Sequence, residues 1–209
     1  MRRALVLIGV VLACFWLRGG LFSTAVAPAA AARKFTPAPV ADSRDVGPRV
    51  VFAPGHYPQL QGGEPHHLHS ILHVAKPMAF GDYVWNDTGV PPGSVWVRID
   101  LARQMLSVFR GDDEIGTAVI IYGANDHPTP VGVFPILQKS PYYYSHSYDA
   151  PMPYALRLTA DGVALHASLV REHRATHGCI GLPLEFAHLL YTATSKGDRV
   201  EILPDNAST

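Results

Sequence analysis

Residues 175–182 have the sequence ATHGCIGL, in which a histidine and a glycine directly precede a cysteine. The thiolate of a cysteine is a strong nucleophile, and Gly178 permits a tight backbone turn that would expose the side chain of Cys179. The same turn would free backbone N–H groups near Gly178 and Cys179, and such groups stabilise a developing oxyanion. The motif therefore predicts nucleophilic catalysis by Cys179.

A nucleophilic cysteine needs a base, and two histidines near the motif are candidates. His166 ends the predicted strand GVALHA upstream of the motif, and a strand end and a following loop can bring two residues together. His177 lies two residues before Cys179. A helix predicted to begin near Pro183 could also favour the thiolate through its dipole. The alternatives are a buried, unreactive thiol and histidines that only pack and form hydrogen bonds.

Short segments that alternate apolar and polar residues follow one another from residue 93 to residue 203. SVWVRID and QMLSVFR are joined by a short turn and predict a β-hairpin. Five further segments are predicted strands: EIGTAVIIYG, GVFPILQ, YALRLT, GVALHA and DRVEIL. The pattern predicts a mainly β domain that is sandwich-like or barrel-like.

One helix is predicted to dock on this domain, over residues 182–197. Its apolar residues follow the spacing i, i+3, i+4, i+7 of one helix face. These residues are Phe186, Leu189, Leu190 and Ala193. Pro183 suits the first turn, Glu185 suits the positive end of the helix dipole, and Gly197 suits the stop.

Four segments occur in an order that is typical of one known family. They are TPVGVF at 129–134, MPYALRL at 152–158, GVALHA at 162–167 and THGCIGLP at 176–183. Together they resemble the L,D-transpeptidases of bacterial peptidoglycan synthesis, also called the YkuD domain. The resemblance covers about residues 93–203.

This resemblance implies a YkuD-like β-rich catalytic domain with Cys179 as nucleophile, His166 as base and no cofactor. The carbonyl of Ala167 would orient His166, and His177 and Gly178 would shape the oxyanion pocket. The implied reaction is acyl transfer from a peptidoglycan stem peptide through a thioester, with β-lactams of the carbapenem type as inhibitors. Hydrolysis of stem peptides by the same site and a non-catalytic wall-binding module stay open as alternatives.

The chain departs from the family pattern at Gly181, where the family usually has an arginine. An arginine there would hold the loop or a substrate carboxylate through paired hydrogen bonds. Arg174, or otherwise Arg171, could supply the missing charge from the short loop before the motif. The remaining predicted substrate-binding residues are Tyr154 and Thr176, and the tyrosines at 142, 143, 144 and 148 could form a contact surface on a loop.

The first 27 residues predict export, because a basic start is followed by 14 apolar residues and a small-residue cleavage site at Ala25-Val26-Ala27. A retained anchor that tethers the protein to the membrane, or a lipoprotein at Cys14, are the alternatives. The predicted location is the periplasm or cell envelope. Cleavage would remove Cys14 and leave Cys179 as the only cysteine.

The rest of the chain divides by composition into four parts. Residues 28–65 are rich in proline, alanine and glycine and predict a tether, 66–92 an accessory segment, 93–203 the catalytic domain, and 204–209 a tail. Within the accessory segment, HHLHSILHV could form a short helix. Its histidines at 66, 67, 69 and 73 could bind a metal, as in a metal-dependent amidase, but solvated surface histidines are the favoured interpretation.

Charge and composition exclude several classes of protein. The chain has 17 basic and 17 acidic residues, and the first 27 residues hold three of the basic ones and no acidic one. The rest is thus slightly acidic and lacks the basic surface that nucleic-acid binding needs. An apolar fraction of 48% excludes general disorder, and two cysteines exclude a disulfide-rich scaffold or a four-cysteine zinc site.

Overall fold

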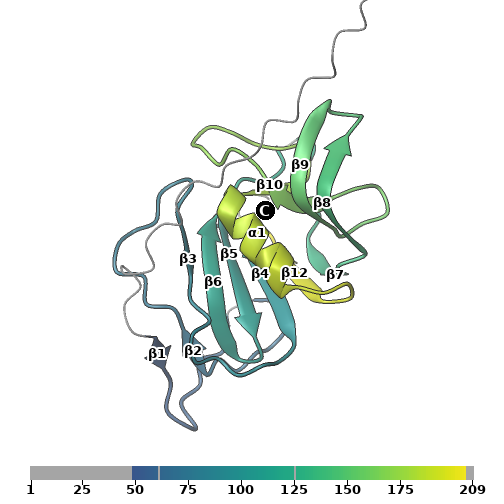
Figure 1. The fold of residues 1–209 in the computed structure, drawn as a ribbon. Coiled ribbons are helices and arrows are strands. Elements are labelled where there is room, and N and C mark those ends of the chain that lie inside the picture. The colour runs from purple at the N-terminus through teal and green to yellow at the C-terminus, as the bar shows by residue number, and fades with distance from the viewer. Residues whose placement is uncertain (1–48, 61, 125, 206–209) are drawn as a thin grey trace, which may run out of the picture. The chain divides into compact units, whose positions relative to one another are not determined.

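The chain forms two β-sheets and one helix in a computed structural model, which describes residues 49–60, 62–124 and 126–205 (Figure 1). The larger sheet has the order β1-β2-β6-β5-β4-β12-β7, and β3 pairs with β6. Its strands are β1 (Val50–Val51), β2 (Ser70–Ile71), β3 (Tyr83–Trp85), β4 (Val95–Asp100), β5 (Met105–Arg110), β6 (Asp113–Val119), β7 (Gly132–Pro135) and β12 (Arg199–Leu203). The smaller sheet has the order β11-β10-β9-β8. Its strands are β8 (Gln138–Ser145), β9 (Ala150–Arg157), β10 (Ala164–Ala167) and β11 (Ile180–Leu182).

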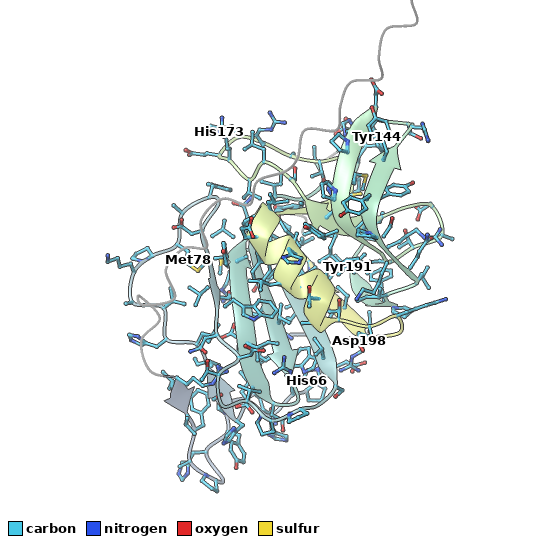
Figure 2. All side chains as sticks on the ribbon, in the orientation of Figure 1. His66, Met78, Tyr144, His173, Tyr191 and Asp198 are labelled. Atoms are coloured by element: carbon cyan, nitrogen blue, oxygen red, sulfur yellow. The ribbon has the colours of Figure 1, made fainter. Side chains whose placement is uncertain are left out.

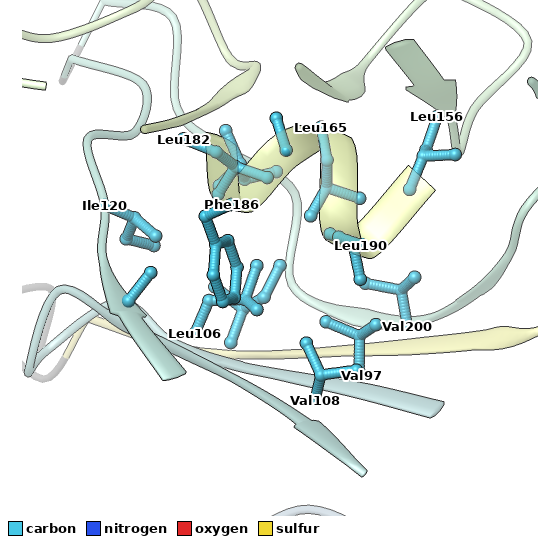
Figure 3. Packing of buried hydrophobic residues seen from close by; sticks show 14 of the residues in the cluster. Val97, Leu106, Val108, Ile120, Leu156, Leu165, Leu182, Phe186, Leu190 and Val200 are labelled. Carbon is cyan, nitrogen blue, oxygen red and sulfur yellow. The ribbon is translucent and has the colours of Figure 1, made fainter. Parts of the chain in front are cut away.

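The helix α1 (Leu184–Ala193) joins the two sheets through one hydrophobic core. Phe186 and Leu190 of α1 lie among side chains from both sheets (Figure 3). Both are fully buried, and burial of such a side chain stabilises a fold by about 1.5–3 kcal/mol. The core thus fixes the smaller sheet, which carries the catalytic motif, on the larger one.

The mainly β architecture with one docked helix is confirmed, and the sheets are open, so the barrel-like alternative is wrong. The predicted hairpin is also confirmed, since β4 and β5 pair antiparallel with Val97 opposite Val108. Alternate apolar residues of these strands, including Val97 and Val108, lie in the core that also contains Phe186 of α1.

The predicted helix is present but shorter than its pattern suggested. It begins after Pro183, with Glu185 in the first turn, and ends at Ala193. Both the backbone N–H and the hydroxyl of Thr194 donate to the carbonyl of Leu190, which terminates the helix before Gly197. Gly197 instead adopts a φ of +95° in the turn that leads to β12.

The short helix predicted at HHLHSILHV is wrong, because this segment is extended and contains β2. Leu68, Ser70 and Leu72 are buried, whereas His69 and His73 between and after them are exposed. This alternation has the period of a strand. A contact with β6 holds the segment in this extended form, because the N–H of Leu72 donates to the Glu114 carboxylate at 3.0 Å.

Two histidines of this segment, His66 and His69, have structural partners, whereas His67 and His73 are exposed. His66 stacks on Trp96 with ring centroids 3.9 Å apart and lies at the opposite end of the view from Tyr144 (Figure 2). It is therefore half-buried rather than solvated, which corrects that prediction. His69 contacts the Asp113 carboxylate at 2.7 Å. In the described part of the chain, no three His, Cys, Asp or Glu side chains are grouped as a metal site.

Part of the segment predicted as a tether packs on the larger sheet. Phe52 and Leu60 pack against the buried side chains of Trp96 and Phe109. Next to them, the guanidinium of Arg98 pairs with the Glu201 carboxylate in a buried contact and donates to the carbonyl of Gly62 at 2.9 Å. Residues 62–65 are thus held by the sheet, while the predicted signal segment lies outside the described residues. Within the described ranges, no helix has the length and apolar character to cross a membrane.

Candidate active site

Two adjacent strands of the smaller sheet position the predicted nucleophile and base. β10 pairs in parallel with β11, with Leu165 opposite Ile180 and His166 opposite Gly181. Leu165 and Ile180 are fully buried in the core, so His166 faces the other side of the sheet. Cys179 directly precedes β11, which brings it beside β10 at the level of Ala164, two residues before the histidine.

The ring of His166 is held in one orientation by its own strand. Its Nδ1 lies 2.8 Å from the carbonyl oxygen of Ala167, the contact that the family resemblance implied. A carbonyl oxygen only accepts hydrogen bonds, so Nδ1 carries the proton and Nε2 keeps a lone pair. Burial lowers the pKa of His166, and the Ala167 hydrogen bond opposes this effect only in part. The imidazole is therefore neutral at neutral pH and can accept a proton.

The side chain of Cys179 is partly exposed and lies against the start of β10. Its Sγ is 3.9 Å from the carbonyl oxygen of Gly162. Burial raises the pKa of the Cys179 thiol, and the Asp161 carboxylate raises it further, whereas the N–H of Ala164 lowers it. The resting cysteine is thus a thiol.

The structure does not support activation of Cys179 by the helix dipole. Four residues, the three of β11 and Pro183, separate Cys179 from Leu184, the first residue of α1, and those of β11 alone span about 10 Å. A helix dipole acts mainly within the first turn. A neighbouring base is therefore needed to remove the proton from the thiol.

The turn of the motif depends on Gly178, which has a φ of +97° and is buried. The hydroxyl of Thr129 donates to the Gly178 carbonyl at 3.0 Å and accepts from the N–H of Gly123 at 2.9 Å. Thr129 is the first residue of the TPVGVF segment, which therefore supports the turn of the motif through this side chain. The sequence analysis missed Thr129 itself, because only the spatial neighbour reveals its function.

Thr176 closes the other side of this turn. Its hydroxyl donates to the Cys179 carbonyl, and its N–H donates to the Tyr122 carbonyl at 2.9 Å. The backbone N–H groups of Gly178 and Cys179 have no hydrogen-bond partner among the residues that the structure describes. They are free to bind an oxyanion beside the thiol.

His177 is exposed and forms part of a small aromatic cluster. Its ring stacks on Tyr148 with centroids 4.8 Å apart and meets the edge of His127 at 5.0 Å. Tyr148 lies in the turn between β8 and β9, so this hairpin approaches the catalytic motif. Tyr142, Tyr143 and Tyr144 are exposed as predicted, but they belong to strand β8 rather than to a loop.

The other predicted substrate-binding residues lie in two different settings. Arg171 and Arg174 are exposed on the loop around His173, which Figure 2 labels, and neither forms an ion pair with a described residue. Tyr154 has a φ of +57° and packs against the rings of His188 and Tyr191 of α1. Contact of these residues with a substrate stays a prediction.

Gly181, where the family pattern has an arginine, has no room for a side chain. A Cβ there would lie 2.7 Å from Cγ1 of Ile121 and 2.9 Å from Cβ of Ser168. The backbones of Gly181 and Ile121 also exchange hydrogen bonds of 2.8 and 3.1 Å, so the two residues cannot separate easily.

We expect Gly181→Ala to destabilise the fold by about 1–3 kcal/mol, because the added methyl group overpacks this contact. The matched control is Gly93→Ala, where a Cβ would meet no atom closer than 3.7 Å and the expected change is within about 0.5 kcal/mol. Urea unfolding followed by circular dichroism measures both. Equal stability of the two variants would contradict the packing argument.

Comparison with known proteins agrees with this geometry. Residues 94–202 match the family model of the YkuD domain, described as the L,D-transpeptidase catalytic domain. The chain belongs to this family. The match coincides closely with the predicted catalytic domain and includes β4 to β11, α1 and most of β12. No curated protein sequence matches the chain.

Solved structures of L,D-transpeptidases share the fold. An enzyme from Stackebrandtia nassauensis is 24% identical with a TM-score of 0.52, and the match covers 57% of this chain and 60% of that one. An enzyme from Mycobacterium smegmatis is 23% identical with a TM-score of 0.51, over 54% and 59% of the two chains. LdtMt1, solved in complex with imipenem, is 23% identical with a TM-score of 0.50, over 53% and 59%. The chain thus spans about 60% of the length of these enzymes.

Proposed function

We propose that this chain is a cysteine-dependent L,D-transpeptidase that forms peptidoglycan cross-links through a Cys179 thioester. The observation that carries the proposal is the arrangement on β10 and β11. A partly exposed thiol lies beside the strand of a histidine whose Nδ1 is bound to a carbonyl and whose Nε2 is available. Membership of the family gives the reaction class.

In the first half-reaction, Nε2 of His166 takes the proton of the Cys179 thiol as Sγ attacks a carbonyl of the donor stem peptide. The carbonyl oxygen becomes an oxyanion, and the N–H groups of Gly178 and Cys179 bind it. The tetrahedral intermediate then expels the amine of the C-terminal D-residue, which receives the proton from His166. A thioester between Cys179 and the shortened stem remains.

In the second half-reaction, an amine of an acceptor stem attacks the thioester. His166 takes a proton from this amine and returns it to the sulfur as the thiol leaves. The product is an amide that joins two stems, and Cys179 is regenerated. Water in place of the amine would give a trimmed stem instead, so the product class distinguishes transpeptidation from hydrolysis.

We further propose that the protein acts in the periplasm or cell envelope, because its substrate lies there and the first 27 residues have the pattern of an export signal. Binding of carbapenem-type β-lactams is part of the same proposal. Support comes from LdtMt1, which was solved in complex with imipenem. A strained lactam needs only the thiol and the two free N–H groups, all of which the site offers.

We expect imipenem to acylate Cys179, because ring opening by the thiol follows the same path as attack on a stem peptide. Mass spectrometry should show an increase by one drug molecule on the Cys179 peptide, and none in Cys179→Ala. Incubation with a donor stem and an acceptor stem should then give a cross-linked dimer. The absence of any adduct on Cys179 with excess drug would overturn the proposal, and trimmed stems alone would assign hydrolysis.

A further inference from the structure

A pocket lies beside the thiol on the face of the smaller sheet that carries His166. Its lining residues come from β8, β9, β10 and the turn before β10: Gln138, Ser140, Tyr143, Ala155, Arg157, Gly162 and Ala164. Gly162 and Ala164 are the two residues whose backbone atoms contact Cys179 Sγ. The pocket and the reacting sulfur thus share two backbone neighbours.

Arg157 is the only charged residue of this lining, and strand register fixes the side on which it lies. It pairs directly with Ala164 in the antiparallel ladder of β9 and β10. Directly opposed residues project from the same face of a sheet, and so do residues two apart on one strand. Arg157, Ala164 and His166 therefore share one face.

The side chain of Arg157 carries a buried donor that no described residue satisfies. Its Nε is buried and has no hydrogen-bond partner among the residues that the structure describes. It also forms no ion pair with any of them, although the Asp161 carboxylate lies near the thiol. Arg98, by contrast, is buried against the Glu201 carboxylate. Buried donors are almost always satisfied, so this one is available to water or to a polar group of a ligand in the pocket.

From this arrangement we infer that Arg157 binds the C-terminal carboxylate of the donor stem peptide. The inference rests on the proposed function. A guanidinium presents paired N–H groups that match the two oxygens of a carboxylate. Arg157 would also supply the positive charge that the family pattern has at the position of Gly181. At Gly181 itself, packing against Ile121 leaves no space for a side chain. Arg171 and Arg174 are then not needed for this contact.

The test measures binding instead of turnover, so that it does not depend on the proposed reaction. The probes are Nα-acetyl-L-lysyl-D-alanine and its C-terminal carboxamide, titrated into full-length Cys179→Ala by NMR. We expect the free acid to bind about tenfold to a hundredfold more tightly than the amide, as for a charge-assisted hydrogen bond. Adding Arg157→Gln should remove this preference and leave the affinity for the amide within about twofold.

Arg174→Gln in the same background tests the competing prediction that Arg174 binds the carboxylate; if Arg157 does so, this variant should keep the preference. Arg157→Lys retains the charge without the paired geometry and should keep a smaller preference, which also covers a failure of Arg157→Gln to fold. A preference that persists in Arg157→Gln, that disappears in Arg174→Gln, or that is absent from the start overturns the inference. Failure of the proposed function would show separately, as a lack of imipenem adduct on Cys179.

Discussion

Replacement of Cys179 by alanine is expected to lower cross-linking by about 10⁴-fold or more, because the reaction then has no nucleophile. The fold should be unaffected, since the thiol is partly exposed and contacts only backbone atoms of Gly162 and Ala164 among the described residues, the former at 3.9 Å. Chromatography of stem dimers measures the activity, and thermal unfolding measures the stability.

The chain offers a matched control for this change in its other cysteine. Cys14→Ala alters the predicted signal segment, outside the described residues, and should leave the activity of the purified protein unchanged. If Cys179→Ala retained more than a few per cent of the wild-type rate, the assignment of the nucleophile would be wrong. If both variants lost activity, an effect of cysteine removal on folding or handling would be the cause.

The fold was predictable where the hydrophobic period was unambiguous. The apolar residues of β4 and β5 alternate, which fits only a strand. Phe186 and Leu190 have a spacing that, with their apolar neighbours, fits only a helix. The HHLHSILHV segment was ambiguous, because Leu68 and Leu72 fit both a helix spacing of four and a strand spacing of two. Pairing with β6 makes the segment a strand, and the contact residue Glu114 lies more than 40 residues after Leu72 in the sequence.

The chemistry of the site was predictable in part, because Cys179 and His166 lie in segments that resemble a known family. The order of these segments along the chain does not, however, show which residues of neighbouring strands lie opposite each other. Only the pairing of β9 with β10 brings Arg157 to the face of the thiol, so the sequence analysis named Arg174 and Arg171, whose contact with a substrate stays a prediction, and not Arg157. Proximity along the chain to the motif favoured those two residues, but sheet pairing brings together residues from different strands.

The protonation state of the site was also beyond the sequence. The position of Cys179 before a helix suggested a stabilised thiolate, whereas β11 intervenes and burial raises the pKa of the thiol. Burial lowers the pKa of His166 in the same environment. Both shifts favour the uncharged pair at rest, so the proton must move from sulfur to nitrogen during the attack on the substrate.

We therefore expect His166→Ala to slow acylation by about 10²–10⁴-fold and to change how the rate depends on pH. In the wild type the rate rises with pH as His166 loses its proton. Because the pKa of His166 is lowered, this rise should lie below the ordinary imidazole range near pH 6.5, and the rate should be level at neutral pH. Without the base, only the small thiolate fraction reacts. Since the pKa of Cys179 is raised, the rate of the variant should climb about tenfold per pH unit through neutrality.

The rate of imipenem acylation measured between pH 5 and pH 9 separates the two histidines. His177→Ala is the control, because His177 is exposed and stacks on Tyr148, and its loss should leave the pH at which the rate rises unchanged. A steep profile in His177→Ala together with a level one in His166→Ala would mean that the two roles are reversed. Two level profiles would instead mean that the thiol is ionised at rest, which contradicts the neutral pair that the burial of both side chains requires.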